Sequence, residues 1–181
     1  RVLQVAHPEA EDRFRGCVDA MRGCGIAVDP RHLAETRFKH SFAARATEEI
    51  LPRWLAEPPG ERIDGLAAAS DQIAIAAARL LQAGGVRVPD DVSIVGFDDI
   101  DDAQASLPSI STVRQPFYEQ GFQAAEKLLA LIRGEEPPRE SVLQAEFIVR
   151  ESCGCGASAD AEDTEEIAVL RPAEDAPESA S

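Results

Sequence analysis

Short apolar runs alternate along the chain with longer segments whose apolar residues recur every three or four positions. The short runs are typical of strands, and the three-and-four spacing is typical of one face of a helix. The pattern predicts strands at residues 2–6, 25–30, 63–69, 92–97, 111–115 and 142–150. Helices are predicted between them, at residues 14–21, 41–57 (kinked at Pro52), 71–81 and 116–132.

Strands that alternate with helices predict an α/β fold, in which an open, doubly wound sheet of parallel strands is flanked by helices. In such sheets, ligands bind beyond the carboxyl ends of the strands. The polar residues predicted at those ends are Arg13, Ser70, Asp71, Asp98, Asp99 and Gln115. One basic, several acidic and two neutral polar groups on one edge suit a small ligand rich in hydroxyl groups.

The chain is acidic in both of its parts. Its net charge is -15 over 181 residues; residues 156–181 hold eight acids and one Arg, which is -7, and the other 25 acids and 17 bases give -8. The sequence shows no Lys or Arg cluster that could hold a phosphate backbone, so DNA binding would have to lie outside it. Residues 154–181, rich in Ala, Ser, Asp, Glu and Pro, are predicted to form a disordered tail.

The sequence predicts neither a membrane segment nor a disulfide-stapled secreted domain. No apolar run is long enough to cross a bilayer, and residues 1–7 lack the features of a signal peptide and begin without Met. We therefore expect part of a longer cytoplasmic protein. Cys17 lies on an apolar helix face and is expected in the core, while Cys153 and Cys155 are too closely spaced for a zinc knuckle. No metal, cofactor or redox chemistry is predicted.

Several ordered motifs resemble the lactose and galactose repressor (LacI/GalR) family of sugar-sensing modules, which is related to periplasmic binding proteins. The likeness covers residues 1 to about 153. The motifs are VPDDVSIVGFDD (88–99), STVRQP (111–116), GFQAAEKLLALIRGE (121–135) and RESC (150–153).

The resemblance implies a clamp of two doubly wound lobes that closes on an effector. Residues 1–115 are then the C-terminal lobe, of the periplasmic-binding-protein type I, residues 116–140 a helix of the N-terminal lobe, and residues 141–153 a strand that returns to the C-terminal lobe. Most of the N-terminal lobe and any helix-turn-helix would lie outside this sequence. The implied protein is a homodimeric, cytoplasmic transcriptional regulator without catalytic activity, whose effector is a sugar or a nucleoside.

The resemblance also implies which side chains contact the effector. The family's Arg, two Asp and Gln contacts fall on Arg13, Asp71, Asp98 and Gln115. An aromatic that stacks on the ligand falls near Phe38, although the surrounding TRFKHSF departs from the usual Gly-Asp-aromatic pattern. Ser70 stands where Asn is usual, which changes the hydrogen bonds offered to the effector.

Simpler structural interpretations stand beside these. Arg13 could pair with neighbouring acids on the surface, Ser70 and Asp71 could cap the helix that follows them, and Phe38 could only pack. For the whole chain, the alternatives are the sensor domain of another signalling protein, which the ending ESCGCG resembles, and a periplasmic sugar-binding protein. A module that docks a partner along helix 117–132 is a further alternative, and a haloacid-dehalogenase-type phosphatase is less favoured.

Overall fold

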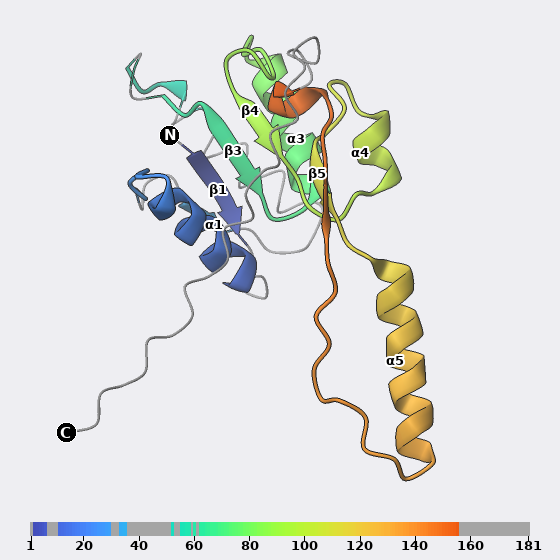
Figure 1. Cartoon of the computed structure of the whole chain (residues 1–181). Helices are drawn as coiled ribbons and strands as arrows, with labels where there is room; N and C mark the ends of the chain where they lie inside the picture. Colours follow the sequence, from blue (N-terminus) through green and yellow to red (C-terminus); the bar gives the residue numbers. More distant parts are fainter. Residues whose placement is uncertain are drawn as a thin grey trace, which may run out of the picture.

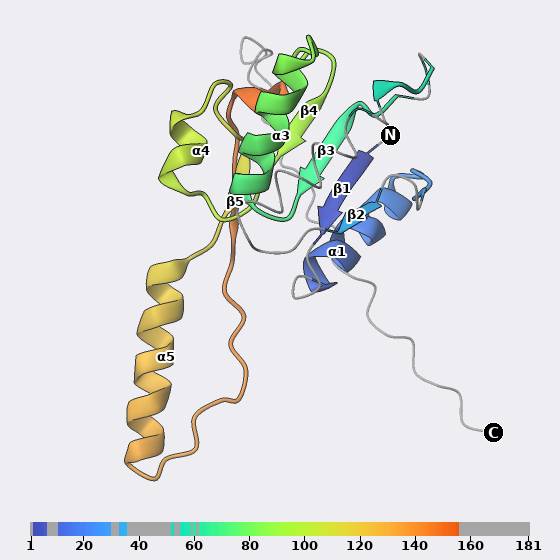
Figure 2. The same ribbon diagram turned by 180° about the vertical axis from the view of Figure 1, so that it is seen from behind.

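The computed structural model describes residues 2–6, 11–29, 33–35, 52, 55–58, 60 and 62–155 (Figures 1 and 2). The strands are β1 (Val2–Ala6), β2 (Leu33–Glu35), β3 (Gly65–Ala68), β4 (Ser93–Val95), β5 (Thr112–Arg114) and β6 (Glu146–Ile148). The helices are α1 (Glu11–Gly23), α3 (Asp71–Ala83), α4 (Asp101–Ala105), α5 (Phe117–Ile132) and the 3₁₀ turn η3 (Glu151–Cys153). Most of the helix predicted at residues 41–57 and the tail from residue 156 onward lie outside the described residues.

The main sheet is parallel, with the strand order β2-β1-β3-β4. Helix α1 covers one face of this sheet and α3 the other (Figures 1 and 2). Single parallel bridges, Val95 to Ser111 and Asp98 to Arg114, place β5 beside β4, and β6 pairs with β5 in the antiparallel direction. The predicted doubly wound α/β fold is therefore confirmed.

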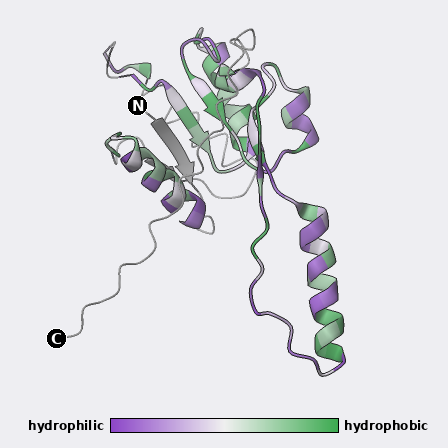
Figure 3. Ribbon diagram, in the orientation of Figure 1, coloured by the Kyte–Doolittle hydropathy of each residue, from purple (hydrophilic) through white to green (hydrophobic). Residues whose placement is uncertain are grey.

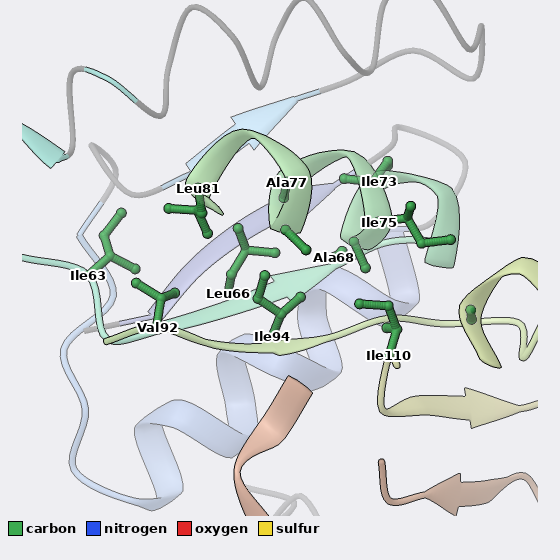
Figure 4. Packing of buried hydrophobic residues seen from close by; sticks show 13 residues of the cluster. Ile63, Leu66, Ala68, Ile73, Ile75, Ala77, Leu81, Val92, Ile94 and Ile110 are labelled. Atoms are coloured by element: carbon green, nitrogen blue, oxygen red, sulfur yellow. The ribbon is translucent and has the colours of Figure 1, made fainter. Parts of the chain in front are cut away.

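The core lies between α3 and the sheet (Figure 4). Ala74 and Ala77 are completely buried, so small side chains let the helix approach the strands closely. Leu81, Ile94 and Ile110 fill the remaining space and are equally inaccessible. Burial of each such side chain contributes about 1.5–3 kcal/mol. This packing fixes the strands whose carboxyl ends carry the polar residues described below.

The prediction of a strand at residues 25–30 is wrong, because the first residues of that segment end helix α1 instead. Gly25 has φ 71, and its N–H donates to the carbonyl of Arg22. The N–H of Ile26 donates to the carbonyl of Met21 at 2.8 Å. This pair of bonds is a Schellman motif, which satisfies the last carbonyls of the helix and turns the chain away. The strand next to β1 is instead β2, which starts at Leu33.

Helix α5 extends away from the sheet, and residues 133–145 return beside it as an extended segment (Figures 1 and 2). No residue of α5 is buried, and Phe122, Leu128 and Ile132 are 52%, 59% and 71% exposed. Figure 3 shows hydrophobic stretches between hydrophilic ones along α5. The return strand is shorter than predicted, since only Glu146–Ile148 pair with β5. Within the described residues, no helix has both the length and the apolar character that crossing a membrane requires.

Candidate functional site

The exits of β4 and β5 bring Asp98 and Gln115 together. Gln115 Nε2 donates a hydrogen bond of 2.6 Å to Asp98 Oδ1, and the Asp98 N–H donates to the carbonyl of Val113 at 3.0 Å. Both side chains are half-buried. Among the described residues, Asp98 Oδ2 has no hydrogen-bond partner. The pair therefore presents a carboxylate oxygen and an amide oxygen, both acceptors, at the carboxyl edge of the sheet.

The backbone turns sharply at this point. Asp98 has φ 113 and Asp99 has φ 57, values that lie outside the regions preferred by residues with a side chain. Such conformations cost about 1–3 kcal/mol each and persist only where the surroundings hold them. The turn sends two successive carboxylates in different directions. Asp98 meets Gln115, and Asp99 meets two arginines.

Asp99 joins the β4 exit to β5 and β6. It accepts hydrogen bonds of 2.6 Å from Arg114 Nε and from Arg150 Nη2, and Arg114 also reaches Glu146 at 3.3 Å. Burial acts to raise the pKa of Asp99, but the hydrogen bonds and charges of the two arginines outweigh it and hold the pKa below its usual value. Sequence reasoning did not identify Arg114 or Arg150, because their meeting depends on the pairing of β5 with β6.

Arg13 reaches the same edge from the first turn of α1. Its guanidinium carbon lies 4.3 Å from the centre of the Phe97 ring, and Nη1 donates to the carbonyl of Ala69 at 2.8 Å. A cation over an aromatic face is held there electrostatically. On the surface of α1, Asp12 pairs with Arg15 at 2.8 Å and Asp19 with Arg22 at 3.6 Å. Arg13 therefore faces the exits of β3 and β4.

Asp71 lies below this edge, with no exposed surface. Oδ1 accepts a hydrogen bond of 2.5 Å from Thr112 Oγ1, and Oδ2 accepts one of 2.9 Å from the Ile100 N–H. Burial raises the pKa of Asp71, an effect that these hydrogen bonds oppose and that nearby Asp98 adds to. Gly96 is required beside it, since a Cβ at that position would overlap the Asp71 carboxylate.

The alternative interpretation, in which Ser70 and Asp71 cap α3 through their side chains, is wrong, because α3 begins at the N-cap Ser70 without a side-chain cap hydrogen bond. The Asp71 carboxylate is used by the β4–α4 loop and by β5 instead. Ser70 is buried at the N-cap position, directly after the carbonyl that Arg13 contacts. Phe38 lies outside the described residues. Asp101 and Asp102 are exposed in the first turn of α4.

A hollow of about 760 Å³ opens at the opposite edge of the sheet, near the starts of β4 and β5. Its lining includes Pro89, Leu107, Pro108 and Gly154, and none of the predicted contact residues. Over the residues that the structure describes, no group of three or more His, Cys, Asp or Glu side chains is arranged to hold a metal ion.

A parallel, doubly wound sheet with polar side chains gathered at its carboxyl edge is the architecture of a ligand-binding lobe. The family model for the periplasmic binding protein-like domain matches residues 3–153, so the chain belongs to that family. The resemblance to LacI/GalR effector-binding domains is confirmed by the relatives that follow.

The HTH-type transcriptional repressor CytR of Escherichia coli (strain K12) is 35% identical over 157 residues, which are 84% of this chain and 44% of the repressor. A transcriptional regulator CelR-cellobiose complex has a TM-score of 0.76 and 32% identity, over 84% of this chain and 46% of that one. A regulatory protein of the LacI family from Chloroflexus aggregans has a TM-score of 0.75 and 28% identity, over 84% and 54%. The chain spans about half the length of these proteins.

Proposed function

We propose that this chain supplies most of the C-terminal lobe of an effector-sensing domain in a LacI/GalR-type transcriptional regulator. The observation that carries the proposal is the Asp98–Gln115 hydrogen bond of 2.6 Å at the same edge as Arg13. These side chains come from three separate segments of the chain.

The chemistry of this edge favours a ligand that bears several hydroxyl groups. Asp98 and Gln115 offer acceptors to hydroxyl donors, and Arg13 offers donors to a ring or hydroxyl oxygen. Ser70 adds a hydroxyl group beside Arg13, and Phe38 is retained as a candidate stacking residue. We propose that Asp71 is a positioning residue, because its oxygens already hold Thr112 and Ile100. The cellobiose named with the CelR structure supports a carbohydrate as the ligand class.

Sensing requires a second surface, which we propose is the N-terminal lobe outside this sequence. The exposed apolar face of α5 supports this, since a finished domain does not leave so large an apolar surface in water. Residues 116–140 then belong to that lobe, and residues 1–115 and 141–153 to this one. An effector that contacts both lobes only when the clamp is closed binds the closed state more tightly than the open state. This difference in affinity stabilises the closed clamp.

The output of this closure is proposed to be DNA binding, by a segment outside this sequence in a cytoplasmic homodimer. Relatives named as transcriptional repressors and regulators support this assignment. The acidic charge of the present chain makes it unsuitable as the DNA-contacting part. The domain would act by binding alone, without catalysis.

The test is calorimetric titration of a longer chain that includes the upstream lobe, with cellobiose, a monosaccharide and a nucleoside as probes. Replacement Asp98→Ala should weaken binding of the preferred probe by about ten- to a hundredfold, because removing an acceptor that the bound effector covers costs about 1–3 kcal/mol. Asp101→Ala, which removes an exposed acid nearby, is the matched control and should leave the affinity unchanged. Equal affinity in the parent and Asp98→Ala proteins would show that this edge does not bind the effector.

A further inference from the structure

Two cysteines that the effector site does not use lie together at the other edge of the sheet. Cys153 ends η3, Gly154 follows with φ 76, and Cys155 comes next. The N–H of Cys155 donates to Cys153 Sγ at 3.4 Å, and Cys155 Sγ lies 3.8 Å from the carbonyl oxygen of Cys153. The turn at Gly154 therefore brings Cys155 back against Cys153.

The turn is anchored on the sheet and is not a loose end. Ser152 is completely buried, and its Oγ donates to the carbonyl of Ile94 at 2.7 Å and accepts from the N–H of Ser111 at 2.8 Å. Ser93 Oγ donates to the Cys153 carbonyl at 3.2 Å. These bonds hold η3 against the starts of β4 and β5. The cysteine pair is therefore presented in a defined geometry, with Cys153 half-buried and Cys155 exposed.

The two thiols are chemically unequal. Burial acts to raise the pKa of Cys153, but hydrogen bonds from Ser111 and Cys155 outweigh it and leave the pKa below its usual value. The pKa of Cys155 is raised, first by its hydrogen bond with Cys153 and then by burial. Since the thiolate is the nucleophile, this difference favours Cys153 as the attacking sulfur, and Cys155, whose N–H donates to Cys153 Sγ at 3.4 Å, lies close enough to follow.

We propose that Cys153 and Cys155 form a reversible dithiol–disulfide site whose oxidant is a low-molecular-weight disulfide such as oxidised glutathione. The Cys153 thiolate attacks one sulfur of the reagent, forms a mixed disulfide and expels one glutathione thiolate. Cys155, after losing its proton, attacks the Cys153 sulfur, closes the Cys153–Cys155 disulfide and expels the second glutathione. The protein loses two protons and two electrons, and the reagent disulfide becomes two thiols. In a reducing compartment such bonds are typically transient and serve as redox sensors.

The spacing of Cys153 and Cys155 in the sequence did not favour redox chemistry, but their geometry in the structure does. Gly154 favours this geometry, because its φ of 76 is strained for residues with a side chain. The site is on the edge opposite to Asp98 and next to the hollow that Gly154 lines. Oxidation of the cysteine pair can therefore be measured separately from effector binding. The test of the disulfide proposal does not depend on the result for the effector site.

The test uses the full chain in buffers of graded oxidised-to-reduced glutathione ratio at neutral pH. Remaining thiols are alkylated after an acid quench, and non-reduced peptides are mapped by mass spectrometry. We expect Cys153 and Cys155 to lose alkylation together, with no bound glutathione and with a link inside one chain. Cys24, an exposed cysteine on another element, is the internal reference and should instead acquire a glutathione adduct.

Single variants identify the order of attack. In Cys155→Ser, the glutathione adduct should accumulate on Cys153, and it should form faster than the adduct on Cys155 in Cys153→Ser. Gly154→Ala, which keeps both thiols, should need a more oxidising ratio to close the bond. Circular dichroism of each variant confirms that it is folded. Independent oxidation of the two cysteines, each carrying its own glutathione, or links only between chains would overturn the proposal.

Discussion

The buried carboxylate of Asp71 should be worth several kcal/mol of folding free energy. Replacement Asp71→Ala leaves two donors without their acceptor, the Thr112 hydroxyl at 2.5 Å and the Ile100 N–H at 2.9 Å. An unsatisfied buried donor costs about 1–3 kcal/mol. Thr112 is completely buried and Ile100 is half-buried, so the two losses together approach about 2–5 kcal/mol. Burial of the carboxylate itself, which raises its pKa, offsets part of this at neutral pH.

A double-mutant cycle with Thr112→Val isolates the hydrogen bond between the two side chains. Thr112→Val alone should cost about 1–3 kcal/mol, and the double variant should cost less than the sum by about 1–2 kcal/mol. The free energies come from urea unfolding followed by circular dichroism, with equal slopes checked in every variant. Asp101→Ala, an exposed acid on α4, is the control and should stay within about 0.5 kcal/mol of the parent. Additive losses for Asp71 and Thr112 would refute the reasoning.

Three further expectations concern the same region and α5. Gly96→Ala should lower the melting temperature by several degrees, since its Cβ would overlap a buried carboxylate, whereas Gly16→Ala, with open space around it on α1, should not. Burial acts to raise the pKa of Asp99, but hydrogen bonds from two arginines hold this pKa below its usual value. The stability that ionised Asp99 adds to the fold is therefore present above about pH 4 and is lost as the pH falls through the lowered pKa. Urea unfolding of Asp99→Asn should therefore show a larger deficit at pH 7 than at pH 3, and an equal deficit would contradict this. Leu128→Lys should reduce self-association of this chain in light scattering, whereas Glu126→Lys, a polar exchange on the same helix, should not.

Local patterns were sufficient to predict most of the strands and helices and the edge at which polar residues gather, but they missed α4 and misplaced the strand beside β1. Apolar runs and helical spacing are short-range signals, and parallel strands place their carboxyl ends together whatever the details of packing. The prediction of a strand at residues 25–30 was wrong because Gly25 and Ile26 form the end of α1. A short apolar segment has the same local pattern in a strand and after a helix end.

The partners of each site residue could not be predicted, because they depend on tertiary pairing. Asp71 bonds to Thr112, 41 positions away, and Arg150 bonds to Asp99 across 51 positions. A carboxylate before an apolar helix has the same local signature whether it caps the helix or reaches across the sheet. The burial of Asp71 decides between these, and burial is a property of the assembled fold.

Asp98 and Asp99 connect the carboxyl edge of the sheet to the strands that lead to and from α5. Both residues adopt positive φ, a conformation that persists only where the surrounding structure holds it. Asp99 is tied by arginines to β5 and β6, through which the chain leaves for α5 and returns. Under the proposed function, an effector bound to Asp98 therefore lies one residue from the carboxylate that is tied to the two strands joining the lobes.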